Sequence, residues 1–108
     1  MLHELFSIIQ NRRSHPGEGS YTAHLFASGE DAILRKVGEE AMEVILATKD
    51  QGNQRVVEEV ADLFYHTLVL LSSRGLSLDD IESELRRRHT DRQNPPVDLS
   101  ADSSLGLR

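Results

Sequence analysis

The fold is decided by residues 30–73, which read EDAILRKVGEEAMEVILATKDQGNQRVVEEVADLFYHTLVLLSS. From Glu30 to Lys49, apolar residues recur at the three- and four-residue spacing that marks one face of a helix. Gly52-Asn53 interrupts the pattern, and the stretch from Gln54 to Ser73 resumes it and is apolar nearly all round. We therefore predict two antiparallel helices that are joined by a short turn and form the core.

Short polar residues and glycines mark the expected ends of these helices. Ser28 is the expected N-cap of the first helix of the pair, and Gly75 is the expected C-cap of the second. Ser77 is then the expected N-cap of a further helix.

The flanking segments add two helices and two loops to this pair. Residues 1–13 carry an apolar stripe and are predicted to be helical, and a last helix follows Ser77. Residues 14–29 are predicted to be a loop because Pro and Gly recur in them, and Tyr21, Leu25 and Phe26 inside it could pack as a short helical turn. We expect an all-α domain over residues 1–92 and a disordered tail over residues 93–108, where Pro, Ser, Asp and Gly replace apolar residues.

The composition excludes several classes of protein. The chain has 108 residues and no cysteine, so we expect one domain without disulfides or thiol chemistry. Its net charge of −6 argues against nucleic-acid binding, which needs a basic face. No run has the length of a membrane span or the layout of a signal peptide. A cytoplasmic protein without membrane contact is expected.

The apolar surface of the helix pair exceeds what so short a chain can cover. The helix over residues 54–73 is apolar on several sides, and Met42 and Leu46 on the preceding helix point away from its main stripe. Burial against a second copy would cover these faces. We therefore expect an all-α, four-helix bundle-type assembly, formed as an intertwined homodimer.

Two acidic motifs lie within the helix pair, Glu39-Glu40-x-x-Glu43 and Glu59-x-x-Asp62. Because a helix turns by about 100° per residue, Glu40 and Glu43 fall on one flank of their core stripe, and Glu39 lies further round, toward solvent. Glu59 falls on the same flank as Asp62, whereas Glu58 projects from the opposite flank. The pairs Glu40/Glu43 and Glu59/Asp62 therefore face one helix–helix seam.

Carboxylates gathered at such a seam must be neutralised or bind a cation. Oxygen ligands suit Mg²⁺ or Mn²⁺, which can neutralise a di- or triphosphate and activate a water. A remaining carboxylate could accept the proton of that water. The sequence contains neither a P-loop nor the spacing of a zinc site.

Each of these features also has a purely structural explanation. A single E-x-x-E motif is usually a solvated helix face, and Lys36 suits an i, i+4 salt bridge with Glu40. His66 is more often a core-edge histidine bonded to Asp62 than a metal ligand. The run Arg86–His89 complements a helix C-terminus or, alternatively, clamps a phosphate.

Taken together, the motifs resemble a known family. The resemblance to phosphoribosyl-ATP pyrophosphohydrolases, a branch of the all-α nucleoside-triphosphate pyrophosphohydrolase superfamily, covers roughly residues 1–90. The segments that carry it are Ser20-Tyr21-Thr22-Ala23, Lys36-Val37-Gly38-Glu39-Glu40-Ala41-Met42-Glu43, Glu59-Val60-Ala61-Asp62-Leu63-Phe64-Tyr65-His66 and Leu85-Arg86-Arg87-Arg88-His89.

The resemblance implies an ATP-binding hydrolase of histidine biosynthesis. It would use Mg²⁺, or Mn²⁺, to convert phosphoribosyl-ATP to phosphoribosyl-AMP and pyrophosphate, the second step of that pathway. The catalytic carboxylates would be four metal ligands and Glu39, which would be an outer-shell group or the base. Lys36 would face the phosphates. The implied metal ligands are Glu40, Glu43, Glu59 and Asp62, and the further candidate substrate contacts are Ser20, Tyr21, His66, Arg88 and His89.

Two other functions are compatible with the same residues. One is a housecleaning pyrophosphohydrolase that prefers ordinary or damaged nucleotides such as dCTP or dUTP. The other is a non-enzymatic acidic helical dimerisation module, which would show no thermal shift with Mg²⁺.

Overall fold

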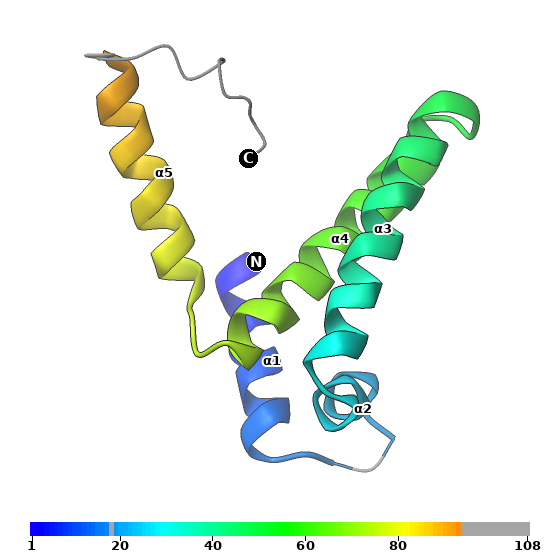
Figure 1. The fold of residues 1–108 in the computed structure, drawn as a ribbon, viewed down its shortest axis with the longest axis vertical. Helices are drawn as coiled ribbons and strands as arrows, with labels where there is room; N and C mark the ends of the chain where they lie inside the picture. The colour runs from blue at the N-terminus through cyan, green and yellow to red at the C-terminus, as the bar shows by residue number, and fades with distance from the viewer. Residues whose placement is uncertain (18, 94–108) are drawn as a thin grey trace. The chain divides into compact units, whose positions relative to one another are not determined.

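The computed structural model describes residues 1–17 and 19–93, with side chains described up to residue 90. The described residues are helical and contain no strand, which confirms the all-α prediction. None of their helices combines the length and the apolarity that crossing a membrane requires. The predicted tail lies outside the described residues beyond residue 93. The helices are α1 (Leu2–Ser14), α2 (Tyr21–Ser28), α3 (Glu30–Asp50), α4 (Asn53–Ser73) and α5 (Leu78–Gln93) (Figure 1).

The chain divides into two compact units, the first of which is Met1–Leu78. The second begins at Asp79, and its described part is the rest of α5. The first unit contains α1 to α4 and therefore both acidic motifs. The predicted single domain over residues 1–92 stays a prediction.

The antiparallel pair α3 and α4 dominates the first unit, as predicted. Each helix has 21 residues and is therefore about 31 Å long. Gly52, with φ of 88°, stands at the sharp turn between them. The observed bounds differ from the predicted ones by one residue at each end of this turn.

Helix α4 ends in a Schellman motif at Gly75, the residue predicted to cap it. The amide of Gly75 donates to the carbonyl of Ser72 at 3.0 Å, and the amide of Leu76 donates to that of Leu71 at 2.9 Å. Gly75 has φ of 74°, a conformation that side chains with a Cβ rarely adopt. This turn ends α4 before the second unit begins.

The predicted loop over residues 14–29 contains a helix, α2, which is longer than the short helical turn expected at Tyr21, Leu25 and Phe26. The side chain of Ser20 caps this helix by accepting a hydrogen bond from the amide of Ala23 at 3.1 Å. The Pro and Gly residues lie outside Tyr21–Ser28, so nothing interrupts the helix, and Leu25 is buried on its inner face.

The predicted N-cap of α3 also differs. Gly29, with φ of 97°, occupies that position without a side-chain cap. Ser28 is the last residue of α2, where its hydroxyl donates to the carbonyl of His24 at 2.9 Å. The hydroxyl of Ser28 therefore bonds to a carbonyl of α2 and does not cap α3.

The hydrophobic core joins α1, α2, the first half of α3 and the second half of α4. Ile33 of α3 and Val69 of α4 are almost fully buried at its centre. The core residues are Phe6, Ile9, Leu25, Ile33, Leu68, Val69, Leu71 and Leu78.

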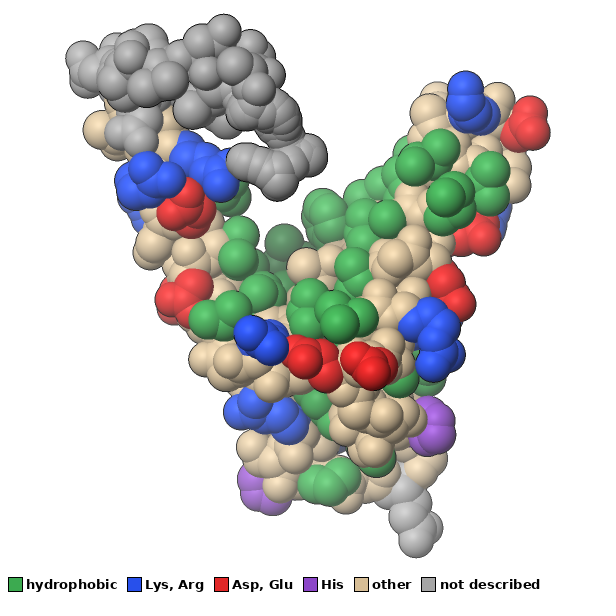
Figure 2. All heavy atoms as spheres, in the orientation of Figure 1, with side chains coloured by type: hydrophobic (Ala, Val, Ile, Leu, Met, Phe, Trp, Pro, Cys, Tyr) green, Lys and Arg blue, Asp and Glu red, His purple; other side chains and the backbone are tan. Residues whose placement is uncertain are grey.

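Apolar side chains also gather on the surface of the α3–α4 hairpin, beyond this core (Figure 2). Val57 and Phe64, two apolar residues of α4, are 61% and 50% exposed in the isolated chain. A helical stripe indicates which residues need cover and does not say whether the same chain supplies it. Met42 and Leu46 are exposed, as predicted.

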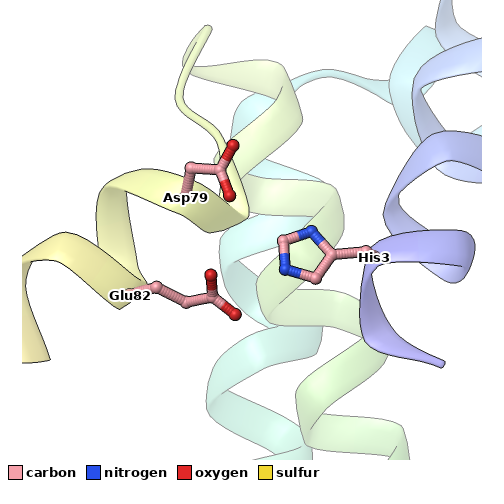
Figure 3. A group of neighbouring side chains, drawn as sticks. All are labelled: His3, Asp79 and Glu82. Carbon is pink, nitrogen blue, oxygen red and sulfur yellow. The ribbon is translucent and has the colours of Figure 1, made fainter.

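Helix α5 forms the described part of the second unit. It starts directly after Ser77, with Asp79 and Asp80 in its first turn, where negative charge is favourable. Figure 3 labels Asp79 and Glu82 of this helix, and also His3 of α1. Further along, Arg87 and Arg88 donate to Glu84 and lower the pKa of its carboxyl group to about 2.

Candidate metal site

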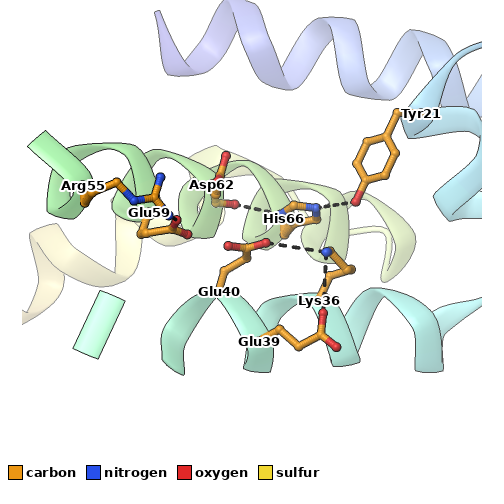
Figure 4. Close-up of polar contacts among 8 residues, drawn as sticks. All are labelled: Tyr21, Lys36, Glu39, Glu40, Arg55, Glu59, Asp62 and His66. Atoms are coloured by element: carbon orange, nitrogen blue, oxygen red, sulfur yellow. Dashed lines mark hydrogen bonds and ion pairs between the residues drawn. The ribbon is translucent and has the colours of Figure 1, made fainter. Parts of the chain in front are cut away.

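Three carboxylates converge across the seam between α3 and α4. Glu40 comes from α3, and Glu59 and Asp62 come from α4; one oxygen of each lies within 4.8 Å of the others. Figure 4 shows Glu40 pointing from its helix toward the pair on α4. Glu59 is only 5% exposed, whereas Glu58 is on the solvent side and belongs to a surface ion pair. Glu59 therefore lies at the seam and Glu58 does not, as helical periodicity predicts.

Glu43, the fourth predicted ligand, is one turn further along α3. It is partly buried, but it does not belong to the group of three found among the described residues. Its role as a metal ligand stays a prediction.

Lys36 borders the group from the preceding turn of α3. Its Nζ atom lies 3.6 Å from Oε2 of Glu40 and 3.5 Å from Oε1 of Glu39. The predicted i, i+4 salt bridge is therefore present. Burial disfavours the charged amine, but Tyr21, Glu40 and Glu39 outweigh burial and raise the pKa of Lys36. A positive charge therefore stays beside the carboxylates.

Glu40 carries the clearest electrostatic signal in this group. Burial raises the pKa of its carboxyl group, and a hydrogen bond with Glu59 and the charge of Asp62 raise it further, against the opposing effect of Lys36. A carboxylate of this kind favours a proton or a cation. Perturbed carboxyl groups that gather at one site are typical of functional sites.

Arg55 contacts the group from the first turn of α4. Its guanidinium donates to Glu59 and, at 2.6 Å, to Oε1 of Glu58. Arg55 is not among the predicted site residues, although its i, i+4 spacing to Glu59 indicates an ion pair.

A hydrogen-bonded chain connects α2 to the same region of α4. Nδ1 of His66 lies 2.8 Å from the main-chain oxygen of Asp62, and Nε2 lies 2.8 Å from the hydroxyl of Tyr21. A carbonyl oxygen only accepts, so Nδ1 carries a proton, and in the neutral ring Nε2 accepts from Tyr21. The structural explanation of His66 as a histidine bonded to Asp62 holds, although the acceptor is the main chain.

Tyr65 completes an aromatic cluster with these two residues. Its ring centre lies 5.0 Å from that of His66 and 6.2 Å from that of Tyr21. Its hydroxyl forms a hydrogen bond with Thr22 of α2. Sequence analysis did not find this contact, because it joins residues 43 positions apart.

The remaining predicted substrate contacts are Ser20, Arg88 and His89. The side chain of Ser20 is engaged in capping α2. Arg88 and His89 lie on α5, in the second unit, so their roles as substrate contacts stay predictions.

The donor set fits a hard divalent cation. It consists of carboxylate oxygens, which Mg²⁺ and Mn²⁺ prefer, and Glu59 among them is buried. Lys36 adds a positive charge at the edge that a phosphate could meet. Fold and site together define the class: an all-α protein with a carboxylate site suited to a divalent cation and a polyphosphate.

Comparisons with known proteins identify the family. The family model described as phosphoribosyl-ATP pyrophosphohydrolase matches residues 2–89. A phosphoribosyl-ATP pyrophosphatase of Listeria welshimeri is 53% identical over 88 residues, 82% of this chain and 84% of that protein. One of Clostridium acetobutylicum is 48% identical over 89 residues, 82% of this chain and 81% of that protein.

A two-function relative matches as well. The histidine biosynthesis bifunctional protein HisIE of Oceanobacillus iheyensis is 47% identical over 85 residues, which are 79% of this chain and 40% of that protein. The chain belongs to the phosphoribosyl-ATP pyrophosphohydrolase family. This confirms the resemblance and the predicted enzyme class, a hydrolase of histidine biosynthesis.

Proposed function

We propose that the chain hydrolyses phosphoribosyl-ATP to phosphoribosyl-AMP and pyrophosphate at the seam between α3 and α4. The observation that carries this proposal is the convergence of Glu40, Glu59 and Asp62 within 4.8 Å, with Glu59 buried. Family membership supports the choice of substrate. The proposed ligands of Mg²⁺, or of Mn²⁺ in its place, are Glu40, Glu43, Glu59 and Asp62.

The reaction transfers a nucleotidyl group to water. The water oxygen forms a bond to the α-phosphorus, the anhydride bond between the α- and β-phosphates breaks, and pyrophosphate leaves with the electron pair of that bond. The chemistry that Mg²⁺ supplies in such a site is neutralisation of phosphate charge and a lower pKa of the attacking water. A carboxylate must accept the proton of that water, and Glu39, half exposed and one residue before Glu40, is the proposed acceptor or an outer-shell partner.

Lys36 and the aromatic cluster are the proposed substrate contacts in the first unit. The raised pKa of Lys36 keeps it charged, so it can pair with a phosphate oxygen. Tyr21 is half exposed, so its ring can contact the nucleotide while its hydroxyl stays on His66. Ser20, His66, Arg88 and His89 complete the proposed set.

We also propose that the chain works as a cytoplasmic homodimer. The exposed apolar residues of the α3–α4 hairpin support this, because a second hairpin packed against the first would bury them in an intertwined four-helix bundle-type core. Sedimentation equilibrium tests it: a dimer mass is expected, and a monomer at micromolar concentration would contradict it.

Genetic complementation tests the substrate most directly. Expression of the chain should restore growth without histidine to a bacterial strain that lacks phosphoribosyl-ATP pyrophosphohydrolase. Asp62→Asn should fail to do so, whereas Asp50→Asn, an exposed carboxylate at the end of α3, should succeed. A purified enzyme that prefers dCTP or dUTP to phosphoribosyl-ATP would contradict the proposal.

A further inference from the structure

Arg55 has an unusual position for a cation. It lies in the first turn of α4, where the helix dipole disfavours positive charge. Two adjacent carboxylates hold it there: Glu58, on the solvent side, and Glu59, which belongs to the buried group of three. Figure 4 shows the guanidinium beside Glu59, at the end of the site away from Lys36.

The pair with Glu59 affects the proposed metal site in two ways. A guanidinium bonded to a carboxylate withdraws charge from the oxygens that would bind a cation, and its own charge repels a dication nearby. It also neutralises Glu59 when no metal is bound, which lowers the repulsion among the three carboxylates. Arg55 thus stabilises the metal-free site and opposes metal binding.

Glu58 provides an alternative partner for the same guanidinium. Its Oε1 atom lies 2.6 Å from Nη1 of Arg55, and Gln54 donates to its other oxygen at 3.2 Å. These two hydrogen bonds hold the carboxylate of Glu58 beside the guanidinium. Arg55 can therefore leave Glu59 without losing an ionic partner.

We propose that Arg55 is a placeholder cation, shared between Glu58 and Glu59, which transfers fully to Glu58 when a divalent cation binds Glu59. This inference rests on the proposed metal site. It assigns Arg55 a positioning role: the residue keeps the carboxylates assembled before the metal arrives, and Glu58 receives it afterwards.

Binding of Mn²⁺, measured by isothermal titration calorimetry on the full chain, tests this proposal. Arg55→Gln should tighten binding by about two- to fivefold, the factor that an ion pair with one exposed partner is worth. Glu58→Gln should weaken binding by a similar factor, because Arg55 then has Glu59 as its only acidic partner. In the double variant Arg55→Gln/Glu58→Gln, the second substitution should not change the affinity for Mn²⁺ any further. The single variant Arg55→Lys keeps the positive charge and should bind Mn²⁺ with an affinity close to that of the wild type.

Arg74→Gln is the matched control, because Arg74 forms an exposed ion pair with Glu30 at 3.0 Å and contacts none of the three carboxylates. It should leave the affinity for Mn²⁺ unchanged. Weaker or unchanged binding by Arg55→Gln would overturn the placeholder role, as would tighter binding by Glu58→Gln. Failure of the wild-type chain to bind Mn²⁺ would instead overturn the metal site itself.

Discussion

Replacing Glu40 by Gln should stabilise the protein when no divalent cation is present. Oxygens of Glu59 and Asp62 lie within 4.8 Å of an oxygen of Glu40, and each such pair repels by about 3.5 kcal/mol at an effective dielectric constant of about 20. Lys36, at 3.6 Å, offsets about 4.6 kcal/mol by the same relation. Because Arg55 also neutralises part of Glu59, we expect a net gain on the order of 1 kcal/mol for the variant.

The gain should depend on pH. The pKa of Glu40 is raised in the folded protein by burial and by Glu59, so the wild type has its full stability from this group below the unfolded pKa. That stability is lost as pH rises through the raised folded pKa. Gln does not titrate, so the difference in stability between variant and wild type should be small below the ordinary carboxyl value of 4.5 and should grow as pH rises above it.

Urea denaturation in excess chelator, at pH 4 and pH 8 and at one protein concentration, measures this effect. Glu39→Gln is the control: Glu39 is 54% exposed and pairs with Lys36, so its loss should lower stability by a few tenths of a kcal/mol. A lower free energy of unfolding for Glu40→Gln than for the wild type at pH 8 would show that these carboxylates do not repel one another.

Three further variants test the fold around the site. Ile33→Ala should lower the free energy of unfolding by about 2–5 kcal/mol in urea denaturation, since Ile33 is 1% exposed; a loss below 1 kcal/mol would mean that the core is packed otherwise. Gly75→Ala should lower it by about 1–2 kcal/mol, because φ of 74° is strained for alanine and no neighbouring atom obstructs the new methyl group. Tyr21→Phe should remove the hydrogen bond to Nε2 of His66 and shift the ¹⁵N resonance of that nitrogen; an unchanged resonance would show that the bond is absent in solution.

The helix pair and the choice of carboxylates could be predicted because both follow from local spacing. A period of 3.6 residues places Glu59 and Asp62 on one flank and Glu58 on the other, whatever the rest of the fold does. The ends of α3 and α4 follow from Gly52 and Gly75. Both glycines have positive φ, a conformation that does not continue a right-handed helix.

The features that were missed depend on long-range contacts. The apolar stripe of α4 showed that Val57 and Phe64 need cover, but periodicity does not tell which surface provides it. The contact between Thr22 and Tyr65 joins two helices that are far apart in the sequence. Helix α2 is longer than the helical turn expected there, because Pro and Gly flank an eight-residue segment that itself has no breaker.

The central claim is that the group of Glu40, Glu59 and Asp62 binds a divalent cation that hydrolysis requires. Pyrophosphate release from phosphoribosyl-ATP, measured against free Mg²⁺ for the wild type and for Asp62→Asn, tests this claim most directly. We predict a wild-type rate that saturates with Mg²⁺ and falls to background in excess chelator, and an Asp62→Asn rate at background throughout. Wild-type turnover in chelator, or turnover by Asp62→Asn at the wild-type rate, would contradict the claim.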